Sequence, residues 1–307
     1  MDRRLFLFAP LAFALVGAPV APGLSLNPQD APLPPTREQP ELASTLDAAL
    51  RHARDVRART NSPEAATDAL TDAIRRIIAE IDLATNPTPA ANDVAQTLRR
   101  TLDDARSIED PGIRLGRMNV GVTEARAAAT FRPIMEAELP EGFPPPGPVG
   151  QVVVKDYPAY RAARTSMTDN MRGQNTAFNR LFRHITTHDV KMTAPVEMVY
   201  DPSRQQAISM AFLYERPNQG ATGEKPGNVE VVDLPAVTVA SIGLRGAESR
   251  TRIEAAEQQL RAWLASPAGA GYEVAGPLRY MGYNSPFVLP YLRFSEVQLP
   301  IRPKPIR

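Results

Sequence analysis

Residues 175–198 change from the periodicity of a helix to that of a strand within one short stretch, NTAFNRLFRHITTHDVKMTAPVEM. In its first part apolar residues recur three and four positions apart, which is typical of an amphipathic helix. Its last part is an apolar run that contains Pro195 and Val196 and is typical of a buried strand. The residues expected on the apolar side of the helix are Met171, Phe178, Leu181, Phe182 and Ile185. A helix followed at once by a buried strand predicts a mixed helix-and-sheet domain.

The same order of elements occurs twice in the C-terminal half of the chain. A strand, a helix and two strands are expected in each copy, and two such units can pair about a pseudo-two-fold axis. The predicted fold class is therefore α+β, with an antiparallel curved sheet or open barrel and two outer helices. The expected strands are 151–160, 192–200, 207–214, 229–244, 272–283 and 287–299, and the second helix is expected over 247–264.

Residues 41–139 have a helical pattern throughout and predict an antiparallel bundle. Ser62-Pro63-Glu64 has the composition of a helix start, because it combines a capping hydroxyl, a proline at the first position and an acid in the first turn. A third helix is expected to begin near Asn92, and a fourth over 123–138 with an interruption at Pro133. The region has no recognisable chemistry, so it is read as a packed bundle or as an arm that binds a partner.

Proline-rich stretches divide the chain into segments. We expect linkers at 27–40 and 140–150, the helical region between them, and the sheet domain over 151–301. Residues 1–26 resemble a signal peptide, with Arg3 and Arg4 before an apolar run. Prolines after the small residues also allow an uncleaved membrane anchor. The predicted localisation is therefore export, to the periplasm, the cell exterior or the membrane through this N-terminal segment.

Composition limits the function. The 35 basic and 34 acidic residues leave no charge excess for nucleic acid, and the absence of cysteine excludes disulfides and thiolate chemistry. With three histidines and none of the sequence motifs of serine hydrolases, zinc proteases or phosphate-binding loops, the chain is predicted not to be an enzyme.

Three pieces of the C-terminal half resemble the SOUL haem-binding family. They are the opening strand with Lys155, Asp156 and Tyr157, the central run 191–196, and the closing segment that ends in Glu296-Val297. Thr186 and Thr187 replace the small turn of the family, and Phe294 and Ser295 also depart from its pattern. The resemblance implies a barrel of two repeats. It also implies reversible, non-covalent binding of haem or a related tetrapyrrole in an apolar groove, for haem buffering or transfer.

The expected tetrapyrrole contacts lie on the first helix of the domain. They are Met171, Arg172, Phe178, Asn179, Arg183 and His184. Arg172, Arg180 and Arg183 could hold propionates or be a solvated outer face. Met171 could contact the macrocycle or belong to the core.

His184 could be a haem axial ligand or a boundary histidine. His184 and His188 are also spaced for a metal on one helical face, but Thr186, Thr187 and Asp189 indicate that the helix ends there, so no protein metal site is predicted.

The alternative to a haem carrier is a non-catalytic protein that senses small molecules or serves as an interaction scaffold. Related effector-binding (GyrI-like) domains share the expected architecture. In this alternative the sheet domain lacks haem affinity and the helical region docks a protein partner.

Overall fold

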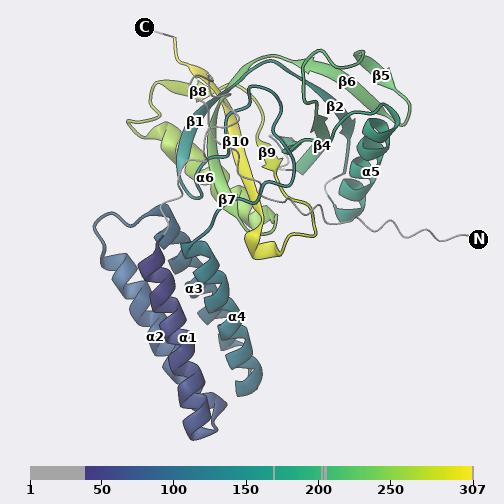
Figure 1. Cartoon of the computed structure of the whole chain (residues 1–307). Coiled ribbons are helices and arrows are strands. Elements are labelled where there is room, and N and C mark those ends of the chain that lie inside the picture. The colour runs from purple at the N-terminus through teal and green to yellow at the C-terminus, as the bar shows by residue number, and fades with distance from the viewer. Residues whose placement is uncertain (1–38, 169, 202, 204–205, 306–307) are drawn as a thin grey trace, which may run out of the picture.

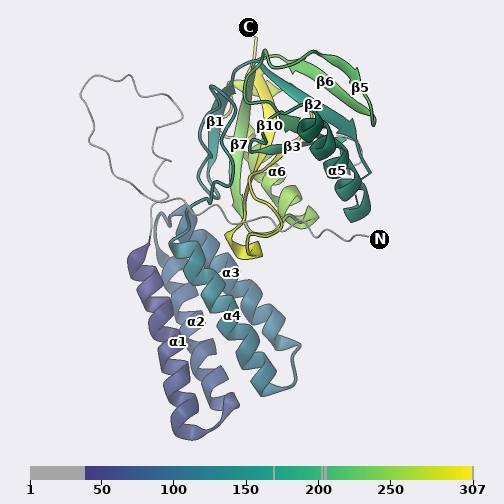
Figure 2. The same ribbon diagram turned by 45° about the vertical axis from the view of Figure 1, so that its right-hand side comes forward.

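The computed structural model describes residues 39–168, 170–201, 203 and 206–305, which form a helical bundle and a sheet domain (Figure 1). The expected signal or anchor at 1–26, and most of the linker at 27–40, lie outside these residues. Within the described part of the chain, no helix combines the length and apolarity required for a membrane span. The bundle projects from one end of the sheet domain, with its four helices side by side (Figures 1 and 2).

The bundle consists of α1 Pro40–Thr60, α2 Pro63–Leu83, α3 Pro89–Arg106 and α4 Pro111–Ala129. Each helix begins with a proline, whose missing N–H would have no partner in the first turn anyway. Ser62, Thr88 and Asp110 cap the last three helices by accepting a backbone N–H. The predicted helix start at Ser62 is confirmed, because these signals are local and depend on a few adjacent residues.

The fourth helix differs from the prediction, since it ends at Ala129 and does not extend over 123–138. Its apolar stripe is weak because small residues replace large ones. Gly121 lies so close to α3 that a Cβ there would overlap the side chain of Thr101. Small residues let two helix backbones approach closely, and this packing is invisible in a search for large apolar residues.

The sheet domain confirms the predicted fold class, and its sheet order is β1-β7-β10-β9-β3-β4-β2-β6-β5, with β8 paired to β10. A pseudo-two-fold axis relates the two halves of this order. It pairs β1 with β6, β2 with β7, β3 with β9 and β4 with β10, and this exchange reverses the first eight positions. Apart from the short β5, each half has two strands before its helix, one more than predicted, because a tight turn divides each of the stretches 151–166 and 229–245. The strands are β1 Val152–Tyr157, β2 Tyr160–Ser166, β3 Val196–Asp201, β4 Gln206–Leu213, β5 Gly223–Lys225, β6 Val229–Leu234, β7 Val237–Arg245, β8 Tyr272–Val274, β9 Arg279–Gly282 and β10 Phe294–Pro303.

Two helices, α5 Met171–Thr187 and α6 Arg250–Ala265, cover one face of the sheet and lie apart from each other (Figure 2). Leu181 of α5 and Leu260 of α6 belong to the apolar core beneath them. The short helix η2 Pro290–Leu292 precedes β10.

The opposite face of the sheet is covered by the segment between α4 and β1, residues 130–151. Phe131 and Phe143 of this segment are buried in a second apolar core with Phe294. The ring of Phe143 makes edge contacts with Tyr157 and Tyr160, at centroid distances of 4.9 and 5.2 Å. The stretch expected to be a linker therefore contributes to the core of the sheet domain.

We predict that Phe143→Ala lowers the free energy of unfolding of the sheet domain by about 3–5 kcal/mol, because it leaves a cavity under the segment. Urea unfolding followed by tyrosine fluorescence measures this change. Phe287→Ala is the matched control, since Phe287 is 83% exposed, and it should have almost no effect. Equal effects of the two substitutions would show that the segment is not packed in solution.

Candidate functional site

Helix α5 is the element on which the sequence placed the candidate ligand contacts. It begins at the N-cap Asn170, whose side chain accepts a hydrogen bond from the backbone N–H of Gly173 at 2.7 Å. Its buried face contains Ala177, Leu181, His184 and Ile185. This face is rotated about the helix axis relative to the predicted stripe, toward Ala177 and His184.

Met171, Phe178 and Phe182 lie on one flank of α5, next to the buried face, as helical spacing requires. Phe178 is half-buried against Phe212 of β4, with ring centroids 5.0 Å apart. Phe182 stacks on Phe178 at 6.1 Å and is 38% exposed, and Met171 is 79% exposed. The expectation that Met171 belongs to the core is therefore wrong, and the three side chains form an accessible apolar strip.

Arg172, Asn179 and Arg183 are exposed on the outer face of α5, adjacent to this strip. Arg180 lies on the other flank, where it lines an open depression of about 380 Å³. Arg172, Thr176 and three residues at the end of β2 and just beyond it, 166–168, also line this depression. The structure thus places cations along the whole solvent side of the helix.

His184 is separated from the other candidates because it points into the domain. Its side chain is buried, and Nε2 lies 2.9 Å from the hydroxyl of Tyr214. Burial lowers the pKa of His184, and the nearby His188 and Lys225 lower it further. An imidazole in this position is a neutral, hydrogen-bonded core residue and is not exposed to a ligand on the α5 surface.

The two neighbouring histidines do share a helical side, since α5 continues to Thr187. The helix ends at Thr187 as expected, with His188 as its C-cap, yet the two ring centroids are only 4.4 Å apart. His188 Nδ1 donates to the carbonyl oxygen of His184 at 2.8 Å. Among the described residues, no group of three or more His, Cys, Asp or Glu side chains is arranged to hold a metal ion.

A buried polar cluster lies on the face of the sheet opposite the helices, and the sequence did not indicate it. At its centre Glu296 of β10 is fully buried and pairs with Lys155 of β1, with Oε1 and Nζ 2.5 Å apart. The hydroxyl of Tyr283 and the amide of Gln298 donate to Oε2 at 3.1 and 2.9 Å. The backbone N–H of Gly147 donates to Oε1 from the covering segment.

The cluster continues to the central strand pair of the sheet. Glu197 of β3 pairs with Arg279 of β9 at 3.2 Å and accepts a hydrogen bond from Tyr160 at 2.9 Å. The guanidinium of Arg279 also lies 5.4 Å from the ring centroid of Tyr157. Burial raises the pKa of Tyr157, and the negative charge of Glu296 raises it further, so this phenol stays protonated.

The family-like motifs of the sequence meet in this interior. Lys155 comes from the opening strand and Glu296 from the closing segment, and they form the ion pair described above. In the central run, the Thr193 hydroxyl donates to the carbonyl oxygen of Leu213 at 2.7 Å, and the Ala194–Pro195 peptide bond is cis. These motif residues hold strands together and do not reach the α5 surface. Charged residues at inward strand positions, such as Glu296 between Ser295 and Val297, were the available signal for the cluster.

We predict that Glu296→Gln lowers the free energy of unfolding by about 3–5 kcal/mol, because it leaves the ammonium group of Lys155 buried without a counter-charge. Glu230→Gln is the matched control, since Glu230 pairs with Arg164 on the surface, and its effect should stay below about 1 kcal/mol. Chemical denaturation measures both changes. A small loss in Glu296→Gln would mean that water reaches Lys155.

The buried His184 predicts a pH dependence of stability. Its pKa is lower in the folded than in the unfolded protein, where 6.5 is the ordinary value, so the unfolded state binds the proton more readily. Stability should therefore fall as the pH drops below about 6.5. In His184→Gln the slope of unfolding free energy against pH should be smaller, whereas His52→Gln, on the exposed side of α1, should keep the wild-type slope. Identical slopes in all three proteins would exclude this role.

Comparison with known proteins places the sheet domain in a family. The solved structures that resemble it include the C-terminal domain of EcmrR (14% identity, 50% of this chain and 98% of that chain, TM-score 0.41). They also include a hydrolase from Listeria innocua (10% identity, 51% and 94%, TM-score 0.41) and SAV2435 bound to tetraphenylphosphonium (10% identity, 50% and 94%, TM-score 0.30). No curated protein matches the chain. A family model described as SOUL heme-binding protein matches residues 149–300, and this C-terminal domain therefore belongs to the SOUL family.

Proposed function

We propose that the sheet domain binds haem or a related tetrapyrrole reversibly on the surface of α5, without catalysing a reaction. The SOUL family is a family of binding proteins, and membership supports a porphyrin ligand. The observation that carries the proposal is the accessible apolar strip of Met171, Phe178 and Phe182 beside a row of cations on the same helix. A tetrapyrrole is a flat apolar ring with carboxylates at one edge, so it needs both surfaces side by side.

The two surfaces divide the recognition between them. The macrocycle would lie on the strip, and Arg172 and Arg183 on the adjoining outer face would bind the propionates as charge-assisted pairs. Asn179 lies between these arginines along the helix and can add a hydrogen bond. If the iron takes a ligand from the strip, the exposed thioether of Met171 is the available donor, because the Nε2 atom of His184 is already bonded to Tyr214.

The test is a titration of the purified protein with hemin and, in parallel, with iron-free protoporphyrin IX, followed by absorbance. We expect saturable one-to-one binding, weakened about tenfold by Phe182→Ala and by the pair Arg172→Gln/Arg183→Gln. Phe287→Ala, which removes an exposed ring elsewhere, should bind as the wild type does. The dimethyl ester of protoporphyrin, which lacks the propionate charges, should not distinguish the arginine variant from the wild type.

The same titrations decide between modes of binding. We expect His184→Ala to leave the Soret shift unchanged. Loss of the shift in this variant would place the iron in the domain interior instead of on the strip. Loss of the shift in Met171→Ala, with intact binding of the iron-free porphyrin, would identify the thioether as the ligand. Absence of saturable binding to either compound would overturn the proposal and favour the interaction scaffold, with the helical bundle as the docking element.

We also propose that the protein acts after export, from the charge and apolar pattern of residues 1–26. The mass of the protein recovered from fractionated cells tests this proposal. A mass below 33.5 kDa in the exported fraction would show removal of the signal. The full mass in the membrane fraction would show an anchor, and the full mass in the cytoplasm would contradict export.

A further inference from the structure

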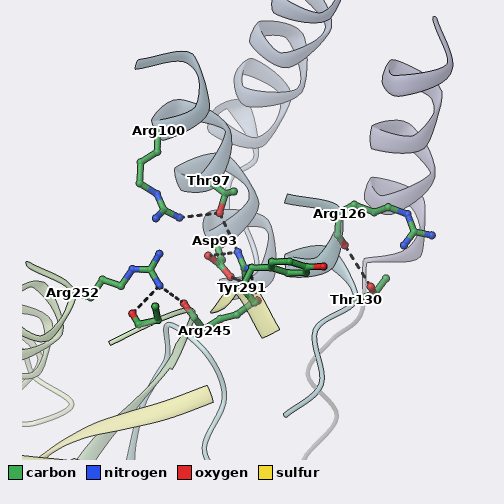
Figure 3. A network of polar contacts seen from close by, with 9 residues as sticks. Asp93, Thr97, Arg100, Arg126, Thr130, Arg245, Arg252 and Tyr291 are labelled. Carbon is green, nitrogen blue, oxygen red and sulfur yellow. Dashed lines mark hydrogen bonds and ion pairs between the residues drawn. The ribbon is translucent and has the colours of Figure 1, made fainter. Parts of the chain in front are cut away.

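The bundle is fixed to the sheet domain by a network of polar contacts at the end of β7 (Figure 3). Arg245 of β7 is buried, and its Nε and Nη2 atoms bind the carboxylate of Asp93 on α3 at 2.6 and 3.2 Å. Its guanidinium also donates to the Thr97 hydroxyl at 3.1 Å and to the carbonyl oxygen of Tyr291 at 3.0 Å. The carboxylate of Asp93 is thus already paired with Arg245.

Two further arginines approach the same place from the two domains. Arg100 of α3 donates to the Thr97 hydroxyl at 3.2 Å, and Arg252 of α6 donates to the carbonyl oxygen of Arg245 at 2.9 Å. Figure 3 shows their guanidinium groups pointing toward one another across the junction. No carboxylate oxygen of the described residues lies within 4.0 Å of either group.

The turn beside Arg252 leaves room for its guanidinium group. Gly246 has φ +117°, and a Cβ on it would overlap the guanidinium of Arg252. Glycine is favoured at this point by its backbone conformation, which L side chains rarely adopt. The guanidinium of Arg252 is held at this turn by hydrogen bonds from Nη1 to the carbonyl oxygens of Arg245 and Ala247, at 2.9 and 3.4 Å.

The charges at the junction do not balance where Arg100 and Arg252 meet. Burial lowers the pKa of Arg252, and the positive charges of Arg100 and Arg245 lower it further, whereas Asp93 and Glu124 act in the opposite direction. Asp93 is paired with Arg245, and Glu124 lies more than 4.0 Å from both guanidinium groups. Two like charges near each other are unfavourable unless a negative group lies between them.

We propose that an oxyanion, a phosphate or a carboxylate, binds between Arg100 and Arg252 and bridges the bundle to the sheet domain. Guanidinium groups bind such anions through pairs of parallel N–H···O contacts, and both arginines have N–H groups that no carboxylate uses. The binding links α3 to the start of α6, so the anion stabilises the docked arrangement of the two domains. This site is separate from the α5 surface and does not depend on a tetrapyrrole.

The test measures the thermal unfolding midpoint of the full chain in sodium phosphate, sodium acetate or sodium chloride at one pH and one ionic strength. We expect a saturable rise of the midpoint with phosphate or acetate and none with chloride. Of phosphate and acetate, the preferred anion is the one whose effect on the midpoint saturates at the lower concentration. Hydrogen exchange should slow with the same anion in residues 93–100 and 245–252.

The variants separate a specific site from a general salt effect. Arg100→Gln and Arg252→Gln should each weaken the apparent affinity about tenfold or more. Arg51→Gln, which removes an exposed arginine of α1, should respond as the wild type does. Arg252→Gln can also disturb the turn at Gly246. Arg100→Gln is therefore the decisive variant, because among the described residues the guanidinium of Arg100 hydrogen-bonds only to Thr97. A rise that is unsaturable, or that persists undiminished in Arg100→Gln, would overturn the proposal.

Discussion

The sheet domain depends on the buried carboxylate of Glu296. A carboxylate without access to water costs several kcal/mol unless charged and hydrogen-bonding partners surround it. Here the partners are Lys155 of β1, Tyr283 after β9, Gln298 of β10 and the backbone of Gly147. These groups are far apart in the sequence, so the carboxylate is satisfied only when the strand order, the register and the covering segment are all in place. A single ionised group therefore makes several elements of the fold depend on one another.

The pseudo-two-fold arrangement provides two equivalent helices, and the chain uses them differently. In the first half, α5 leaves Met171 and Phe182 exposed beside a cationic outer face. In the second half, Arg252 at the start of α6 donates to the carbonyl oxygen of Arg245, the residue that binds the bundle. Duplication explains why both helices lie on the same face of the sheet. The side chains then give one copy an accessible apolar strip and place the other beside the attachment of the bundle.

Local signals allowed much of the architecture to be predicted. The start of α2 at Ser62 and the break between α2 and α3 depend on a few adjacent residues, and the fold class depends on periodicity over whole segments. The exposure of Met171 and the burial of His184 could not be predicted in this way. An apolar stripe defines a broad side of a helix, whereas the sheet beneath decides which edge of it is covered. On α5 the core accepts a histidine because Tyr214 supplies a hydrogen bond.

The interior cluster and the attachment of the bundle could not be predicted from the sequence for a second reason. Both depend on pairs that lie more than a hundred residues apart, Lys155 with Glu296 and Asp93 with Arg245. The proline-rich segment was expected to be a linker because proline cannot donate to a strand ladder. A segment without ladder hydrogen bonds can still bury a ring such as that of Phe143. The bundle is therefore attached to the sheet domain at two points, through this packed segment and through Arg245. A partner that binds the bundle would meet a surface whose position relative to α5 is already set.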